Sequence, residues 1–131
     1  MRIILIAAVA AVFMILEIYR ETHTFKVTRY TDKLKKSTAE KKVIFISDLH
    51  NCTYGKDNEK LLKAVRDESP DLILSSGDIL IGNSKAPTET AERFLTEACK
   101  IAPVYCANGN HEQRLKEGNA QCSAVYADYK E

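Results

Sequence analysis

The sequence lacks the cysteine pattern of a structural metal site. Its four cysteines contain no CxxC pair and no Cys/His set with zinc-finger spacing: Cys52, Cys99, Cys106 and Cys122. Free thiols, buried or half-buried, are therefore expected, although an exported domain could oxidise them to disulfides. Cys52 could line a site because it lies two residues after His50. As a metal ligand it is disfavoured, since the oxygen-rich residues around it suit harder ions.

A strong net charge is also missing. The formal net charge is +1, so the composition gives no reason to expect nucleic acid or another polyanion as a partner. The sequence contains no internal repeat and no low-complexity segment. Its 131 residues, 45% hydrophobic and 28% charged, leave room for about one globular domain.

A long hydrophobic run is present only at the N-terminus. Ile3–Leu16 is uninterrupted, and counting through Tyr19 brings it within the roughly 17–25 residues of a membrane span. No small-residue cleavage site follows the run. An uncleaved single-pass anchor over residues 1–20 is therefore favoured over a signal peptide or a buried soluble helix. More basic residues follow the anchor than precede it. By the positive-inside rule this would place the domain in the cytoplasm, although single short anchors do not always obey that rule.

Residues 21–41 are predicted to hold an edge strand and a basic linker. Thr22–Tyr30 alternates roughly between apolar and polar side chains, as an edge strand does. The following residues, 31–42, are lysine-rich and show no periodicity. They are expected to form a solvated linker or to face anionic headgroups.

Residues 42–131 have the pattern β-α-β-α-β, followed by a partly helical segment from Gln113. Apolar runs at 43–47, 71–76 and 103–107 predict three strands, the first of them buried on both faces. Amphipathic stretches between them predict helices capped by Asp57 and Thr88. Because the crossovers are long enough for helices, the strands should be parallel, and ligands then gather at their carboxyl ends.

Polar side chains follow each predicted strand. They form three groups: Asp48-Leu49-His50, Gly77-Asp78, and Asn108-Gly109-Asn110-His111. Asp48, Asp78 and Asn110 are separated by 30 and 32 residues, one β-α unit each time. Carboxylate, imidazole and amide ligands suit two divalent cations, with Mn, Fe or Zn favoured over Mg. Such a pair, roughly 3.5–4 Å apart, can activate water for phosphoryl displacement. The glycines would let the backbone approach the ions closely.

These residues resemble the first three signature blocks of the calcineurin-like metallophosphoesterases. The matching blocks are Asp48-x-His50, Gly77-Asp78 and Gly109-Asn110-His111-Glu112. The hydrophobic N-terminus resembles that of the membrane-anchored bacterial branch of this family. The resemblance implies an α/β fold, the N-terminal half of a four-layer α/β/β/α sandwich, preceded by a transmembrane helix. It also implies hydrolysis of phosphomonoesters or phosphodiesters by water activated at two metal ions.

The resemblance also implies roles for individual side chains. Asp48 and His50 would bind one metal, Asp78 would bridge both metals, and Asn110 would bind the other. His111 would help to protonate the leaving group and stabilise the transition state, and both it and Asn110 would contact the substrate.

Two neighbouring residues have alternative roles. Asn51 could touch the phosphate or serve the turn of its loop. Glu112 could orient the catalytic histidine or cap the following helix.

The later histidine ligands of the family are missing from this sequence. Its remaining histidine, His23, lies near the anchor and is expected at the surface. Residues 42–131 are therefore expected to be a truncated N-terminal part of the phosphoesterase domain. The alternative function is a non-catalytic, phosphoesterase-like scaffold or an inactive fragment. The substrate itself is not indicated.

Overall fold

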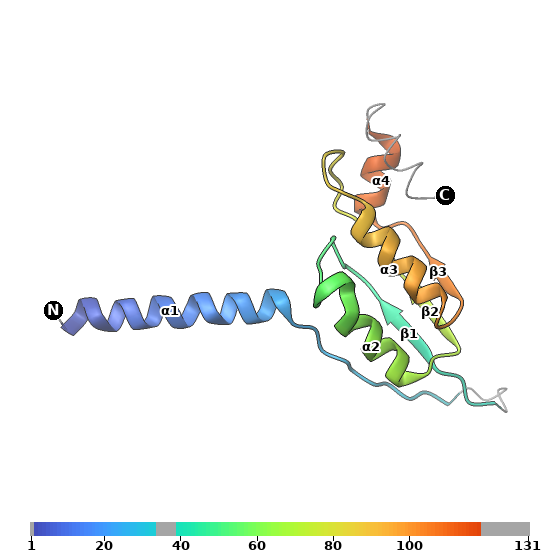
Figure 1. The fold of residues 1–131 in the computed structure, drawn as a ribbon, viewed down its shortest axis with the longest axis horizontal. Coiled ribbons are helices and arrows are strands. Elements are labelled where there is room, and N and C mark those ends of the chain that lie inside the picture. Colours follow the sequence, from blue (N-terminus) through green and yellow to red (C-terminus); the bar gives the residue numbers. More distant parts are fainter. Residues whose placement is uncertain (1, 34–38, 119–131) are drawn as a thin grey trace.

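The computed structural model describes residues 2–33 and 39–118 (Figure 1). The elements in chain order are α1 (Arg2–His23), β1 (Val43–Ile46), the 3-10 turn η1 (Lys56–Asn58), α2 (Glu59–Glu68), β2 (Leu72–Ser75), α3 (Glu89–Cys99), β3 (Val104–Cys106) and α4 (Asn110–Glu117). The α/β class and the β-α-β-α-β order are confirmed. The predicted helical segment beyond residue 118 lies outside the described residues.

The three strands form one parallel sheet in the order β1-β2-β3. Val43 is in register with Leu72, and Ile73 with Val104. Parallel pairing was predicted, and it brings the carboxyl ends of all three strands to one edge. Figure 1 shows α2 and α3 side by side on one face of this sheet.

The core lies between the sheet and these two helices. Leu61, Leu62 and Val65 of α2 are buried together with Phe94 of α3 and the β2 side chain Ile73. Burying a side chain of this size stabilises the fold by about 1.5–3 kcal/mol. The same core includes residues close in sequence to the predicted ligands: Leu49, Ile79 and Leu80, and Leu115 in the second turn of α4. Each ligand-bearing loop is thus anchored by an apolar neighbour.

β1 is buried on one face only, so its predicted burial on both faces is wrong. Val43 and Phe45 are 51% and 66% exposed, whereas Ile44 and Ile46 pack against the core. Tyr105 of β3, 65% exposed, also lies outside the core. The described residues form one sheet with helices on one face, and they include no second sheet of the expected four-layer sandwich. An apolar run indicates that a strand can be buried on both faces. It does not indicate which helices or strands cover each face.

The predicted caps of α2 and α3 are also absent. Asp57 has φ 51° and forms an ion pair with Arg93 at 2.5 Å. Asn58, which is fully buried, precedes α2 and accepts a hydrogen bond from the backbone N–H of Tyr54 at 2.8 Å. The side chain of Thr88 makes no capping hydrogen bond to α3. A distant ion pair and a hydrogen bond within the preceding loop therefore take the place of a side-chain cap at the start of α2.

α1 is long and apolar enough to cross a membrane, a test that a signal sequence near the N-terminus also passes. None of its residues is buried. The helix continues to His23, and the Thr22 and Thr24 hydroxyls donate to carbonyls four residues earlier, each at 2.8 Å. These bonds satisfy the threonine hydroxyls locally at the end of the helix.

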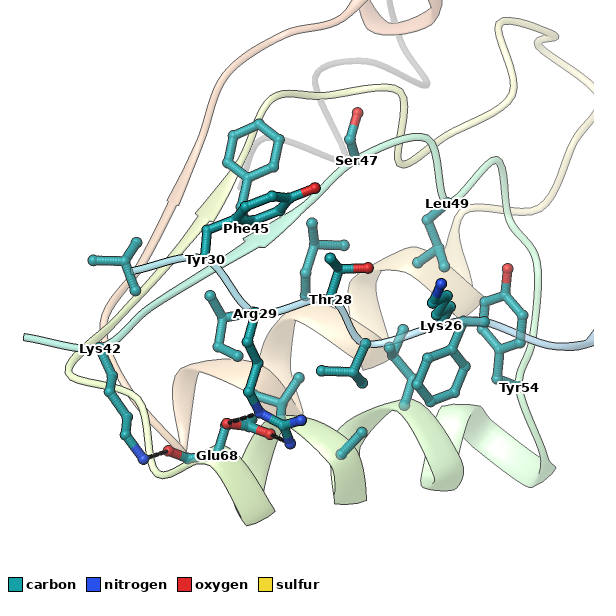
Figure 2. A pocket seen from close by; sticks show the side chains of 18 of the residues that line it. Lys26, Thr28, Arg29, Tyr30, Lys42, Phe45, Ser47, Leu49, Tyr54 and Glu68 are labelled. Carbon is teal, nitrogen blue, oxygen red and sulfur yellow. Dashed lines mark hydrogen bonds and ion pairs between the residues drawn. The ribbon is translucent and has the colours of Figure 1, made fainter. Parts of the chain in front are cut away.

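The predicted edge strand at Thr22–Tyr30 is therefore wrong. Residues 24–33, called the tether below, have no regular secondary structure. A groove of about 580 Å³, lined by tether, β1 and α2 side chains, separates the tether from the sheet (Figure 2). Side chains attach the tether instead. Phe25 packs edge-on against Tyr54 with ring centroids 5.1 Å apart, and Arg29 donates to both carboxylate oxygens of Glu68.

Acidification is expected to release the tether. The hydrogen bond from Arg29 lowers the pKa of the Glu68 carboxyl below its ordinary value. A carboxyl with a lowered folded-state pKa stabilises the fold above its unfolded-state pKa, and this contribution is lost as the pH falls through the lowered value. Backbone amide shifts of residues 26–31, followed by NMR, should change as Glu68 is protonated. In Arg29→Gln the transition should move to higher pH. An identical transition in both proteins would contradict the role of the ion pair.

Candidate metal centre

The loops that follow β1 and β2 are joined by backbone hydrogen bonds. The N–H groups of Asp48, His50 and Asn51 donate to the carbonyls of Gly77, Asp78 and Ile79, at 3.2, 2.9 and 2.9 Å. Asp48, His50 and Asp78 have φ values of 57°, 47° and 55°. Non-glycine residues adopt this left-handed conformation at a cost of roughly 1–2 kcal/mol each, and such strain is concentrated at functional sites.

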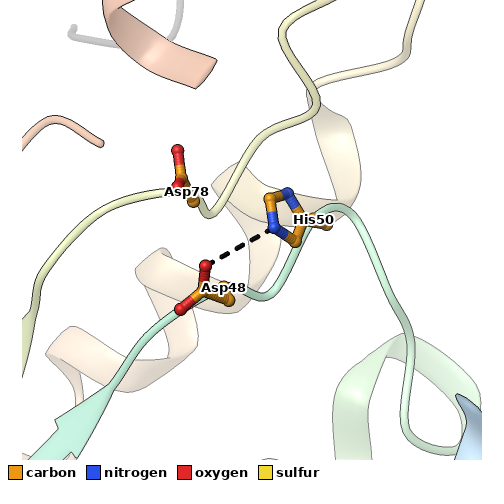
Figure 3. Close-up of side chains that lie close together, drawn as sticks. All are labelled: Asp48, His50 and Asp78. Carbon is orange, nitrogen blue, oxygen red and sulfur yellow. Dashed lines mark ion pairs between the residues drawn. The ribbon is translucent and has the colours of Figure 1, made fainter. Parts of the chain in front are cut away.

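These loops bring together an Asp/His/Asp cluster that could hold a metal ion (Figure 3). One ligand atom from each of Asp48, His50 and Asp78 lies within 4.8 Å of the others. His50 Nε2 is 3.6 Å from Asp48 Oδ1, and the Asp48 side chain is 62% exposed. Two carboxylates and an imidazole, open to solvent on one side, form a donor set that suits a divalent transition metal.

Asn110, the first residue of α4, faces the same carboxylate. With its amide nitrogen turned to Asp78, it donates to Oδ1 at 3.1 Å and to Oδ2 at 2.6 Å. With its amide oxygen turned there, three acceptor oxygens converge, an arrangement that a shared cation would stabilise. The side-chain chemistry at this position therefore fits a second metal ligand.

His111 also reaches the cluster. Its backbone N–H donates to Asp78 Oδ1 at 2.8 Å, and its ring centroid lies 4.6 Å from that of His50. Its Nδ1 accepts a hydrogen bond from the backbone N–H of Gly82 at 2.7 Å. The structure thus brings all five residues predicted for the metals and for catalysis to one edge of the sheet.

The Glu112 side chain makes no hydrogen bond to the His111 ring, whose orientation was the first of its two predicted roles. Its side chain is buried and accepts hydrogen bonds from the N–H groups of Asp78, Leu80 and Gly109, at 2.8, 2.9 and 2.9 Å. The bond from Gly109 caps α4, the second alternative predicted for this residue. The other two bonds fix the loop after β2 against the start of α4. Glu112 therefore supports the site without facing it.

Two glycines allow the loops after β2 and β3 to meet. Gly77 has φ +99°, and a Cβ there would lie 2.0 Å from the Gly109 nitrogen. A Cβ on Gly109 would lie 2.3 Å from Asp78 Oδ1. Since such contacts are sterically forbidden, only glycine allows the backbone and the Asp78 carboxylate to approach so closely.

Asn51 has a loop contact. Its amide nitrogen donates to the Pro87 carbonyl at 2.6 Å, while its Oδ1 is buried without a hydrogen-bond partner. One N–H of the amide is thus engaged within the loop itself, which favours the loop role. A phosphate contact by Asn51 stays a prediction.

The remaining predicted side chains lie apart from the cluster. His23 is exposed and stacks on Tyr19 with ring centroids 4.1 Å apart. Cys52, Cys99 and Cys106 are free thiols, as predicted, but they are exposed rather than buried. Cys122 lies outside the described residues.

Sequence reasoning missed two serines beside the ligands. Ser47 donates a hydrogen bond to Asp48 Oδ2, and Ser76 donates to the Ser47 hydroxyl at 2.8 Å. The signal was present, since each serine lies just before a ligand-bearing loop. Gly82 was missed because its contact with His111 depends on a loop whose path no local pattern predicts.

Comparison with protein families gives a match over most of the domain. The family model for the calcineurin-like phosphoesterases matches residues 41–131, more than half of the chain. No curated protein and no solved structure matches the chain. The matched region contains every residue of the Asp/His/Asp cluster, together with Asn110 and His111.

Proposed function

Because the chain belongs to the calcineurin-like phosphoesterase family, we propose that it acts as a metal-dependent hydrolase of phosphomonoesters or phosphodiesters. The observation that carries this proposal is the convergence of Asp48, His50 and Asp78 at the carboxyl edge of the sheet. Carboxylates and an imidazole at one solvent-open position suit the binding of divalent cations, which phosphate esters require for hydrolysis by this route.

The finer proposal is a site for two cations, with Mn, Fe or Zn as the metals. Asp48 and His50 would hold the first, Asp78 would hold both, and Asn110 would contribute to the second. The approach of the Asn110 amide to both Asp78 oxygens supports this division. When bound, the cations supply Lewis acidity that activates water and neutralises charge on the phosphoryl oxygens.

His111 is the proposed catalytic residue of the chain. It lies beside His50 at the start of α4, where the helix dipole favours an anionic ligand such as a phosphate group. A donor nitrogen of its ring would contact an oxygen of the ester. Asn110 would contact the substrate from the same turn of the helix.

The proposed location is a membrane, with α1 as a single-pass anchor. The length and hydropathy of α1 support this location. The tether begins directly after α1, and Phe25 packs on Tyr54 near the start of α2. The domain would therefore be held close to the bilayer surface, where it could act on membrane-bound or soluble phosphate esters.

Metal removal is expected to abolish hydrolysis. The 131-residue chain, and the longer product if its reading frame continues past Glu131, would be purified in nanodiscs and assayed with aryl phosphate mono- and diesters. We expect Mn²⁺-dependent hydrolysis that a chelator lowers by at least about a thousandfold, because metal activation contributes several kcal/mol. Added Mn²⁺ should restore the rate.

The outcome distinguishes the proposed enzyme from its alternative. Tight Mn²⁺ binding, followed by electron paramagnetic resonance, without hydrolysis in either product would favour the non-catalytic scaffold. Hydrolysis that survives chelation would contradict a metal-dependent mechanism.

A further inference from the structure

The His111 ring is held from the loop after β2, four residues beyond the proposed metal ligand Asp78. The backbone N–H of Gly82 donates to His111 Nδ1 at 2.7 Å. A backbone N–H can only donate, so Nδ1 must present its lone pair. A neutral imidazole carries one ring hydrogen, which must then be on Nε2.

Gly82 packs directly against this histidine. A Cβ at Gly82 would lie 3.1 Å from His111 Nδ1 and 3.1 Å from the His111 carbonyl oxygen. Both distances are shorter than ordinary van der Waals contact. A side chain at this position would therefore push the ring away or move the loop, and the hydrogen bond would lengthen.

The segment that leads to Gly82 is anchored. Ile79 and Leu80 are fully buried in the core, and the Leu80 N–H donates to Glu112 at 2.9 Å. On the other side, the His111 N–H donates to Asp78 Oδ1. The segments that carry the donor and the acceptor of the Gly82–His111 bond are thus each tied to a carboxylate, the buried Glu112 and the half-buried Asp78, and these contacts fix the geometry of the bond.

The opposite nitrogen of the ring is available to a ligand. Among residues 2–33 and 39–118, none makes a hydrogen bond to His111 Nε2. The ring lies edge-to-face with His50, at an interplanar angle of 69°. A hydrogen on Nε2 would make this nitrogen a donor, whereas the other tautomer would present a lone pair that repels phosphate oxygens.

We propose that Gly82 is a positioning residue, whose N–H fixes the Nε2–H tautomer of His111. His111 then donates a hydrogen bond to an oxygen of the phosphate ester. The identity of this acceptor rests on the proposed function; the tautomer does not. In this arrangement the Nε2–H group stabilises charge on the ester oxygen in the way that a preorganised donor does.

NMR of the metal-free chain in nanodiscs tests the tautomer directly. The three histidines, His23, His50 and His111, can be assigned by single substitutions. At about pH 8.5, where imidazoles are neutral, we expect His111 Nδ1 to give the signal of an unprotonated ring nitrogen and Nε2 that of a protonated one. A through-hydrogen-bond ¹⁵N–¹⁵N coupling should join the Gly82 amide to His111 Nδ1.

Gly82→Ala is the matched variant, and Lys85→Ala, an exposed substitution in the same loop, is its control. The alanine should remove the coupling and produce a mixture of His111 tautomers, while the control keeps the wild-type signals. In the active protein, Gly82→Ala should lower kcat about tenfold, less than the full loss of one preorganised donor, because part of the His111 rings would still carry the Nε2 hydrogen, and it should leave Mn²⁺ affinity unchanged.

Two results would overturn the inference: an Nδ1–H tautomer in the wild type, or wild-type coupling and tautomer signals in Gly82→Ala. Should the NMR signals depend on Gly82 while no substrate is hydrolysed, the positioning of His111 stands and the proposed function fails.

Discussion

Replacing Asp78 with asparagine is expected to lower Mn²⁺-dependent hydrolysis by about a thousandfold, which corresponds to about 4 kcal/mol of transition-state stabilisation. In the proposed site, Asp78 would hold both cations. Asparagine supplies one neutral oxygen in place of two charged ones. Its amide oxygen can still accept the His111 N–H, which donates to Asp78 at 2.8 Å in the wild type. The fold should therefore survive while metal binding is lost.

Steady-state hydrolysis of an aryl phosphate and a Mn²⁺ titration would measure both effects. Asp67→Asn is the matched control, since Asp67 is an exposed carboxylate of α2 that pairs with Lys63 at 2.5 Å, outside the cluster. The control should keep wild-type rates. Hydrolysis by Asp78→Asn at a rate comparable to the wild type would rule out the shared-ligand mechanism.

Replacing Glu112 with alanine is expected to destabilise the domain by at least about 3 kcal/mol. The Glu112 side chain is 1% exposed and accepts hydrogen bonds from the backbone N–H groups of Asp78, Leu80 and Gly109. Alanine would leave these donors without an acceptor, and each buried unpaired donor costs about 1–3 kcal/mol. Urea unfolding followed by circular dichroism would measure the free energy of unfolding.

Two further variants separate the hydrogen bonds from other effects of the substitution. Glu112→Gln keeps one acceptor oxygen but directs an NH₂ group at backbone donors, so its loss of stability should be intermediate. Glu117→Ala removes an exposed carboxylate from the same helix and should change stability by no more than about 0.5 kcal/mol. Equal stability of Glu112→Ala and the wild type would contradict the buried network.

Much of the candidate site was predictable because its ligands follow simple local patterns. Apolar runs predicted the three strands, and the carboxyl-edge rule for parallel sheets predicted that Asp48, Asp78 and Asn110 would meet. The inward faces of α2 and α3 followed from their helical periodicity. These predictions depend on properties of a segment and its immediate neighbours, which the sequence displays directly.

The wrong predictions concern partners rather than propensities. Thr22–Tyr30 has the alternation of an edge strand, but α1 continues to His23 and the tether has no strand beside it. Asp57 is a good capping residue, yet it pairs with Arg93, 36 residues later. A local pattern indicates which secondary structures and caps a segment can form, and tertiary contacts determine which of them it adopts.

By itself, the sequence determined the order of the elements and the family, and it predicted the metal-binding side chains, because each is encoded within a few adjacent residues. Only the tertiary structure decided how those side chains are held. The contact of Gly77 with Gly109, the acceptance of the Asp78 and Leu80 N–H groups by Glu112, and the bond from Gly82 to His111 all join the loop after β2 to the start of α4. These contacts link residues about thirty positions apart, and they exist only because parallel strands end at a common edge.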